Sequence, residues 1–244
     1  QIKHDAIIAG QPETHATTYS NSVGIFLGLI VSRSSNSINS LAVWSTSREQ
    51  SVNLFSRQAI PMAWDFPEVN PFSGAAGDFF VSAKSVAKII ERCRAKIKGK
   101  AFQQNAKNVN VMNKIVSTDP PYYNNIAYAD LSDFFYIWLR SSLKPVVPDL
   151  FTTLAVPKSE ELVALPHRHE NVEEAEKFFL NGMRQVMNRL AEQTHPSYPV
   201  TIYYAFKQSE SNRDGTTSTG WETFLEAVID AGFTITGTWP VRTE

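Results

Sequence analysis

The chain has 244 residues, of which 43% are apolar and 19% are charged, so it has enough apolar surface for a folded core and is excluded from the disordered class. Lys and Arg number 23 against 24 Asp and Glu, and the formal net charge of −1 excludes a strongly basic nucleic-acid coat protein while leaving a local basic patch open. The single cysteine, Cys93, excludes an internal disulfide and a zinc site built from cysteines. Its place in an apolar pattern predicts a small buried residue.

No segment approaches the about 18–20 apolar residues that a membrane helix needs, since the longest apolar run covers only 24–31. The N-terminus also lacks the charged and apolar stretches of a secretory leader. We therefore expect a cytoplasmic protein with no membrane partner. Because the sequence starts at Gln1 without Met and stops at Glu244 directly after a predicted strand, we expect a piece of a longer protein, with terminal processing as the alternative.

The first eighty residues predict a helical and irregular N-terminal segment. Apolar residues at helical spacing predict a buried helix over 23–31, followed by a stretch rich in Ser and Asn. Residues 41–80 contain several aromatic residues and prolines, which predict an irregular connector with short helices. We therefore divide the chain into an N-terminal segment, 1–80, and a second region, 81–244.

Predicted helices and strands alternate in the second region. Helices are predicted over 82–98, 128–143, 173–194 and 221–231. Strands are predicted over 100–106, 113–118, 200–206 and 233–239. This alternation predicts an α/β fold with a mostly parallel sheet and flanking helices.

The most specific motif is Asp119-Pro120-Pro121-Tyr122, placed where the strand over 113–118 ends. Ligands of open α/β sheets bind at the carboxyl ends of the strands, so a functional site is expected there. The alternative is a structural loop with a capping Asp and a core Tyr. Tyr123 and Asn124 extend the loop, where they are expected either to contact a substrate or to form a turn.

These residue types suit the methylation of an exocyclic amine on a nucleobase. The lone pair of such a nitrogen is delocalised into the ring, and a carboxylate (Asp119) beside a carbonyl (Pro120) can accept both amino hydrogens, which localises the lone pair and aims it. The prolines fix the backbone and remove donors, so the loop presents acceptors. Tyr122 supplies a flat face for a base taken out of its stack.

Asp-Pro-Pro-Tyr resembles the signature of S-adenosylmethionine-dependent methyltransferases that act on base amines. The longer run over 119–143 resembles a group of large prokaryotic proteins described as adenine-specific DNA methyltransferases, as do the segments 57–79, 157–169 and 232–244. The resemblance covers roughly residue 40 to the end of the chain. The Asp-Pro-Pro-Tyr motif is specific for amino-methyl transfer, whereas the longer runs mark the group without known chemistry.

The resemblance implies a Rossmann-like methyltransferase fold, S-adenosylmethionine as cofactor and DNA as partner. It implies that Asp119, Pro120, Pro121 and Tyr122 form the catalytic motif, with Tyr123 and Asn124 on the substrate side. Two alternatives stay open. One is an enzyme that acts on RNA or on protein amides, and the other is a non-catalytic nucleic-acid-binding module with a vestigial site.

The glycine-rich cofactor turn of such enzymes has no clear counterpart in this sequence. Residues 70–78 are the nearest match, but they have one residue too many and no obvious strand before them. Asn105 and Ala106 are the positions that the resemblance offers for contact with the cofactor, with an exposed loop amide as the alternative. We therefore expect a chain that lacks the first cofactor-binding strands, with the remainder of the parent polypeptide or a partner chain completing the site.

Two further patterns are weaker. A basic run predicts either phosphate contacts or a solvated helix face; its residues are Lys84, Lys88, Arg92, Arg94, Lys96, Lys98 and Lys100. His167 and His169 share a loop but lack a convincing third ligand, so no metal site is predicted.

Overall fold

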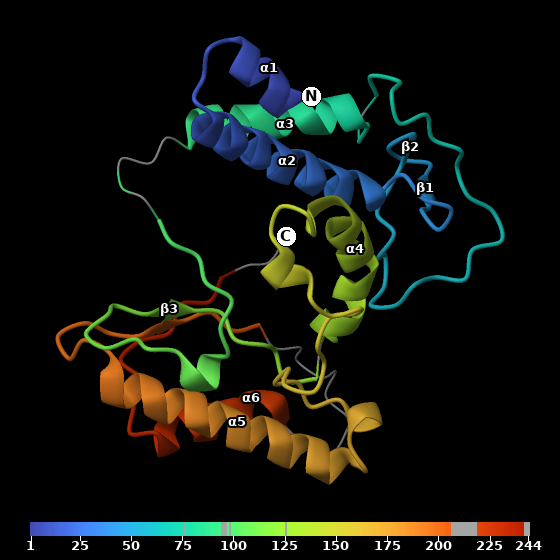
Figure 1. Cartoon of the computed structure of the whole chain (residues 1–244). Helices are drawn as coiled ribbons and strands as arrows, with labels where there is room; N and C mark the ends of the chain where they lie inside the picture. Colours follow the sequence, from blue (N-terminus) through green and yellow to red (C-terminus); the bar gives the residue numbers. More distant parts are fainter. Residues whose placement is uncertain (76, 94–96, 98, 125, 206–218, 242–244) are drawn as a thin grey trace. The chain divides into compact units, whose positions relative to one another are not determined.

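The computed structural model (Figure 1) divides the chain into two compact units. Unit 1 contains Gln1–Gly99 and Tyr128–Lys158, and unit 2 contains Lys100–Ala127 and Ser159–Glu244. The structure describes residues 1–75, 77–93, 97, 99–124, 126–205 and 219–241. Within those ranges, no helix is both long enough and apolar enough to cross a membrane. The two units do not divide at residue 80, because unit 1 extends to Gly99 and also takes in the later segment that begins at Tyr128.

The described part of unit 1 consists of helices and a short hairpin. Its elements are α1 (Ile2–Ile8), α2 (Glu13–Ser35), β1 (Trp44–Ser45), β2 (Gln50–Ser51), α3 (Phe79–Arg92), α4 (Tyr128–Leu143) and the 3-10 helix η2 (Pro148–Phe151). The strands β1 and β2 pair antiparallel. Because α1, α3 and α4 each pack against α2 (Figure 1), α2 is the central helix of the unit.

A glycine permits the close approach of α2 and α4. A Cβ atom at Gly28 would lie 2.6 Å from Cδ2 of Leu143, the last residue of α4, which is closer than Cβ contacts come. Leu143 is buried at this contact. The helix predicted over 128–143 is confirmed with the same bounds.

The central helix α2 is longer than the helix predicted over 23–31. It begins directly after Pro12 and runs to Ser35. The hydroxyl groups of Thr17 and Thr18 donate to carbonyl oxygens four residues earlier, at 2.8 and 2.9 Å, so these polar side chains bond within the helix instead of ending it. The spacing of the apolar residues therefore predicted only the middle of α2.

Helix α3 begins earlier than predicted, because a side chain caps it. The carboxylate of Asp78 accepts the backbone N–H of Val81 at 2.6 Å and starts the helix at Phe79. The helix ends at Arg92, and Cys93 leaves the helical conformation. Cys93 is exposed, so the prediction that it is buried was wrong: its side chain no longer continues the apolar face of α3.

The connector that follows α2 contains a hairpin instead of the predicted short helices. No helix forms over residues 41–75, a stretch that the structure describes throughout. Phe55 packs against Phe134 and Phe135 of α4, with ring centroids 6.0 and 5.8 Å apart. Within α4, Phe134 and Phe135 thus pack the connector against the helix.

Two short parallel strands form the sheet of unit 2. The elements of this unit are η1 (Ala106–Asn108), β3 (Ser117–Thr118), η3 (Pro166–Arg168), α5 (Val172–Gln193), β4 (Thr201–Ile202) and α6 (Thr219–Asp230). The strands β3 and β4 are parallel. The N–H of Tyr203, the residue after β4, donates to the carbonyl of Thr118, the last residue of β3, at 2.8 Å.

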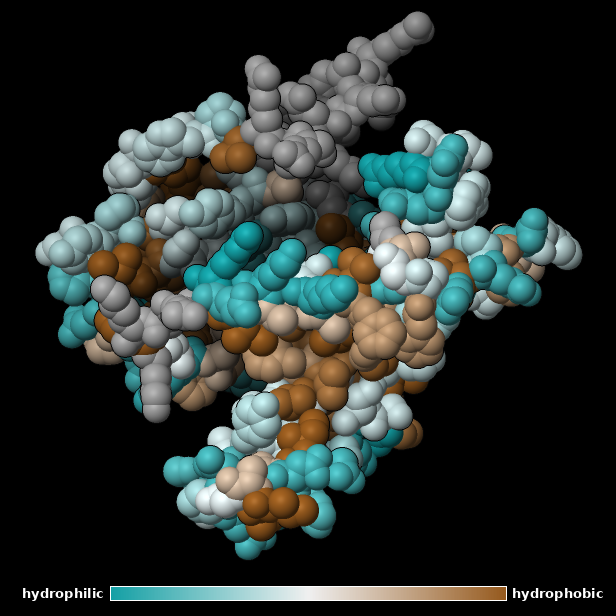
Figure 2. Space-filling model, turned by 90° about the horizontal axis from the view of Figure 1, so that it is seen from above, coloured by the Kyte–Doolittle hydropathy of each residue, from teal (hydrophilic) through white to brown (hydrophobic). Residues whose placement is uncertain are grey.

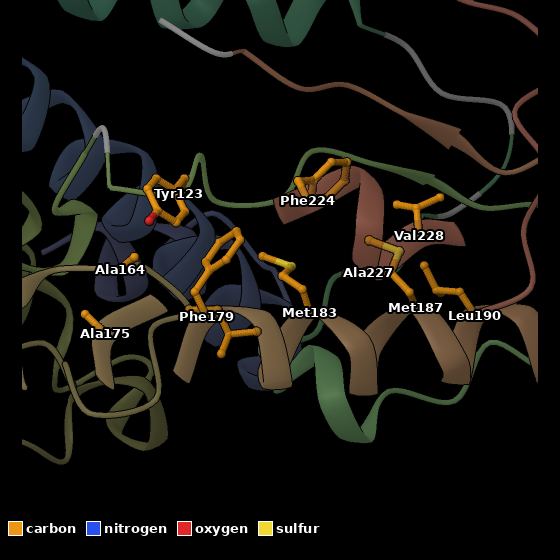
Figure 3. Close-up of a cluster of buried hydrophobic side chains, with 11 residues drawn as sticks. Tyr123, Ala164, Ala175, Phe179, Met183, Met187, Leu190, Phe224, Ala227 and Val228 are labelled. Carbon is orange, nitrogen blue, oxygen red and sulfur yellow. The ribbon is translucent and has the colours of Figure 1, made fainter. Parts of the chain in front are cut away.

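The core of unit 2 lies on one face of α5. Asn171 caps the helix by accepting the N–H of Glu174 at 2.9 Å. Buried apolar residues then recur every three or four positions, as a helix face requires: Phe179, Met183, Met187 and Leu190. Figure 3 shows these side chains packed with residues of α6, namely Phe224, Ala227 and Val228. Burial of this face holds α5 against α6.

Two of the four strands predicted in the second region form in the structure. The strands predicted over 113–118 and 200–206 form the shorter β3 and β4, while the strands predicted over 100–106 and 233–239 were wrong, because those residues are irregular apart from the start of η1. The Rossmann-like fold class stays a prediction, since one parallel pair in the described chain is common to many α/β folds.

Candidate functional site

The Asp-Pro-Pro-Tyr motif begins directly after β3, at the carboxyl end of the parallel pair. Thr118 is the last residue of β3, and Asp119 follows it. Because parallel strands end at the same edge of a sheet, the residues after β4 lie beside the motif, as the bond from Tyr203 to Thr118 shows. The structure thus places the motif at the sheet edge where the sequence predicted it.

Asp119 presents a solvent-exposed carboxylate. The hydroxyl of Tyr122 donates to its Oδ1 atom at 2.6 Å. Across the described residues, the other carboxylate oxygen, Oδ2, has no hydrogen-bond partner. The carboxylate is therefore oriented by one bond and keeps an acceptor open to an incoming N–H group.

The carbonyl groups of the two prolines differ in their hydrogen bonding. The carbonyl of Pro121 accepts the backbone N–H of Tyr123 at 3.2 Å. No backbone N–H in the described part of the chain reaches the carbonyl of Pro120. Since neither proline has an N–H to donate, this stretch offers the acceptors of Asp119 and Pro120 without a competing donor between them.

The ring of Tyr122 stands at the edge of an aromatic cluster. It contacts Tyr204, which follows β4, edge to face at 5.5 Å. Tyr204 in turn stacks on Phe224 at 4.2 Å and lies 5.5 Å from Trp221. Sequence reasoning missed Tyr204 and Trp221. The available signal was the pair of tyrosines in the strand predicted over 200–206, which parallel pairing brings beside the motif.

Tyr123 turns away from the surface into the core of unit 2. Only 8% of it is exposed, and its hydroxyl donates to Oε1 of Glu176 on α5 at 2.6 Å. Burial, reinforced by the bond to this carboxylate, raises the pKa of the Tyr123 phenol far above its ordinary value, so the hydroxyl stays protonated. Asn124, by contrast, is exposed and remains available to a substrate.

The Asn105–Ala106 segment lies against a different part of α5 from the motif. The side chain of Asn105 accepts the N–H of Lys107 at 2.9 Å and donates to Glu160 at 3.2 Å. The end of η1 is held by Arg189, whose guanidinium donates to the carbonyls of Asn108 and Val109. The loop after the motif contacts α5 at Glu176, and the end of η1 contacts it at Arg189. These two helix positions are thirteen residues apart, which is about 20 Å along the helix axis.

The glycine-rich turn over 70–78 belongs to unit 1 and is closed by its own aspartate. The buried carboxylate of Asp78 accepts N–H groups from both Gly74 and Val81. It therefore occupies the helix N-terminus that an anionic ligand would use. Neither this turn nor Asn105 gives the described residues an evident fit to S-adenosylmethionine.

The basic run and the histidines are the remaining candidate site residues from the sequence. On α3, Lys84, Lys88 and Arg92 are exposed at one-turn spacing, whereas Arg94, Lys96 and Lys98 lie outside the described residues. His169 packs on the ring of Phe178 at 4.8 Å. In the part of the chain that the structure describes, no three His, Cys, Asp or Glu side chains gather as metal ligands.

Comparison with protein-family models, with curated proteins and with solved structures finds no match to this chain. The interpretation of the site therefore depends on its own geometry and on the motif.

Proposed function

We propose that this chain is the later part of the catalytic domain of an S-adenosylmethionine-dependent methyltransferase that acts on an exocyclic base amine, with adenine in DNA as the first candidate. The observation that carries the proposal is the Asp119-Pro120-Pro121-Tyr122 loop at the carboxyl end of a parallel strand pair, with an oriented and exposed carboxylate. Carboxyl ends of parallel strands are where α/β enzymes bind their ligands.

The loop's part in the reaction is to hold the amine. Asp119 Oδ2 and the Pro120 carbonyl accept its two hydrogens, which turns the nitrogen lone pair away from the conjugated ring. The ring of Tyr122, supported at its edge by Tyr204, stacks on the base. The hydroxyl of Tyr122 keeps the Asp119 carboxylate in one orientation, so little reorganisation is needed when the amine binds.

We propose that residues outside the described ones hold the cofactor, in another part of the polypeptide or in a partner chain. Asp78 and Asn105 both accept N–H groups of their own local backbone, so these acceptors are already used within the chain. The exposed basic residues of α3 are proposed to contact phosphates, which fits DNA as the partner. Such contacts add affinity without reading a base sequence.

The first experiment is calorimetric titration of the 244-residue chain with S-adenosylmethionine. The expected result is no saturable binding by the folded chain, because the described residues give the cofactor no evident pocket. Saturable binding would instead make residues 70–78 the prime candidate for the cofactor turn and overturn the proposal that other residues hold it.

The decisive experiment measures transfer of a labelled methyl group by the parent enzyme to an oligodeoxynucleotide that contains adenine. Asp119→Ala should abolish transfer, while the control Asp65→Ala, which removes an exposed loop carboxylate, should leave it unchanged. Near-normal turnover by Asp119→Ala would overturn the assignment. Mass analysis of the product distinguishes methyladenine from methylated RNA or glutamine, and DNA binding that ignores both cofactor and Asp119 would indicate a non-catalytic module.

A further inference from the structure

The residue that follows the motif has an unusual backbone conformation. Tyr123 has φ +44°, in the left-handed region that non-glycine residues seldom adopt. Such a conformation costs free energy and persists only where neighbouring contacts hold it. The contacts that hold Tyr123 therefore also fix the direction in which the Asp119–Tyr122 loop leaves the core.

Those contacts come chiefly from α5. Glu176 accepts the hydroxyl of Tyr123 at 2.6 Å, and Phe179, one turn further along, packs edge to face on its ring at 5.2 Å. Residues three apart share one helix face, so both contacts come from the same side of α5; Figure 3 shows Tyr123 beside Phe179. Because Phe179 is fully buried in the core of unit 2, this face is rigidly placed.

Two other segments close around Tyr123. The backbone N–H of Ala164 donates to the Tyr123 carbonyl at 3.0 Å. A Cβ atom at Gly220, near the start of α6, would lie 2.7 Å from the Tyr123 ring, so only a glycine lets α6 approach this closely. The hydroxyl bond to Glu176 is the one polar side-chain contact among these, and burial makes its loss costly.

We infer that Glu176 is a positioning residue for the amine-binding loop: it anchors Tyr123, and Tyr123 sets the place of Asp119 and Tyr122 at the sheet edge. The inference rests on the proposed function only for what the loop binds, since the anchor itself is a matter of geometry. It gives Tyr123 an anchoring role in place of the substrate contact expected from the sequence.

The test is residue-specific amide hydrogen exchange and chemical shift, measured by NMR on the full chain. In Glu176→Ala and in Tyr123→Phe, the backbone amide at position 123 should exchange about tenfold faster. This increase corresponds to the loss of one hydrogen bond to a charged group. The resonances of Asp119 and Tyr122 should shift in both variants. Glu176→Gln keeps an acceptor oxygen and should restore most of the protection.

The matched control is Glu173→Ala, which removes an exposed carboxylate from the same helix and should leave the loop unchanged. Urea unfolding is measured in parallel. A lower free energy of unfolding without change at Asp119, Tyr122 and Tyr123 would make the pair merely structural and overturn the inference, as would failure of Glu176→Gln to rescue. Because the readout is conformation and not turnover, the anchor can be confirmed even if Asp119→Ala transfers methyl groups normally.

Discussion

Unit 1 and unit 2 bury their apolar residues in different ways. Unit 2 has a continuous core of large side chains on α5 and α6, with Phe179, Met183 and Met187 almost fully buried. Unit 1 has fewer buried apolar residues among those that the structure describes, and three of them are small: Ala16, Ala42 and Ala129. Most of the large apolar side chains that are exposed in the described chain belong to unit 1, and apolar surface is visible in Figure 2.

This difference shows where rigidity is concentrated. The motif loop of unit 2 is anchored by Tyr123 to the buried face of α5, so the candidate site stands on the better packed unit. Unit 1 gains less free energy from burial for each large apolar residue that it contains. Substitutions in the two units should therefore differ in their effects.

The largest effect is expected in the core of unit 2. Phe179→Ala removes a fully buried ring that also supports Tyr123, and it should lower the free energy of unfolding by about 3–5 kcal/mol. Urea denaturation followed by tryptophan fluorescence measures it. The control Phe102→Ala removes a ring that is 80% exposed and should change stability by less than about 0.5 kcal/mol. If both variants lost the same free energy of unfolding, the proposed difference between the buried core and the exposed surface would be wrong.

A pair of glycines on α2 tests the packing of unit 1. Gly28→Ala places a Cβ against Leu143 and should destabilise the chain by about 1–3 kcal/mol, whereas Gly24→Ala, with its nearest neighbour atom at 3.9 Å, should stabilise it by up to about 1 kcal/mol through helix propensity. Thermal unfolding of the two variants checks the opposite signs. If both stabilise, α2 and α4 can separate freely and unit 1 is looser than described.

The hydroxyl of Tyr122 tests the site on unit 2. Tyr122→Phe keeps the ring beside Tyr204 but removes the bond to Asp119, so kcat for methyl transfer by the parent enzyme should fall about tenfold with little change in KM. Steady-state kinetics at varied oligonucleotide concentration measures both constants. A loss in KM alone would mean that the hydroxyl contributes to binding and not to orientation.

The smallest effect concerns an ion pair in unit 1. Burial alone would raise the pKa of Asp133, but bonds from Lys158 and the Val156 N–H lower it below its ordinary value of 3.8. A lowered pKa stabilises the folded state above pH 3.8, and this contribution is lost as the pH falls through the folded pKa. Asp133→Asn should therefore cost about 1 kcal/mol or less at pH 7, and this cost should shrink as the pH falls below 3.8.

Urea titrations of both proteins at several pH values check this prediction. The control Asp149→Asn removes an exposed carboxylate on η2 and should change stability by less than about 0.5 kcal/mol. A cost of Asp133→Asn that persists unchanged in acid would show that the hydrogen-bonded shape of the side chain matters and its charge does not.

The helices could be predicted from the sequence far better than the strands. The spacing of apolar residues on α5 predicted it to within one residue at each end, because a face such as Phe179–Met183–Met187 repeats over several turns. Residues 233–239 alternate in the way of a strand but form none, since a strand needs a partner and local pattern cannot supply one.

In the candidate site, too, only the features that depend on residues adjacent in the chain could be predicted. The position of Asp119 after a strand could be read from the sequence, because the motif and the strand are adjacent in the chain. The roles of Glu176 and Tyr204 could not, since they depend on contacts between residues 53 or more positions apart or on the pairing of β3 with β4. The capping of α3 by Asp78 could have been predicted from the sequence, because an Asp directly before an apolar run is typical of a helix N-cap.

The chain passes from one unit to the other at Gly99–Lys100, at Ala127–Tyr128 and at Lys158–Ser159. No single cut can therefore release either unit as a continuous polypeptide. The pairing of Ser117 with Thr201 closes a loop that contains the whole of α4, and such a distant contact forms late because its closure entropy is large. The candidate site, built at that closure, is thus expected to be among the last parts of the molecule to assemble during folding.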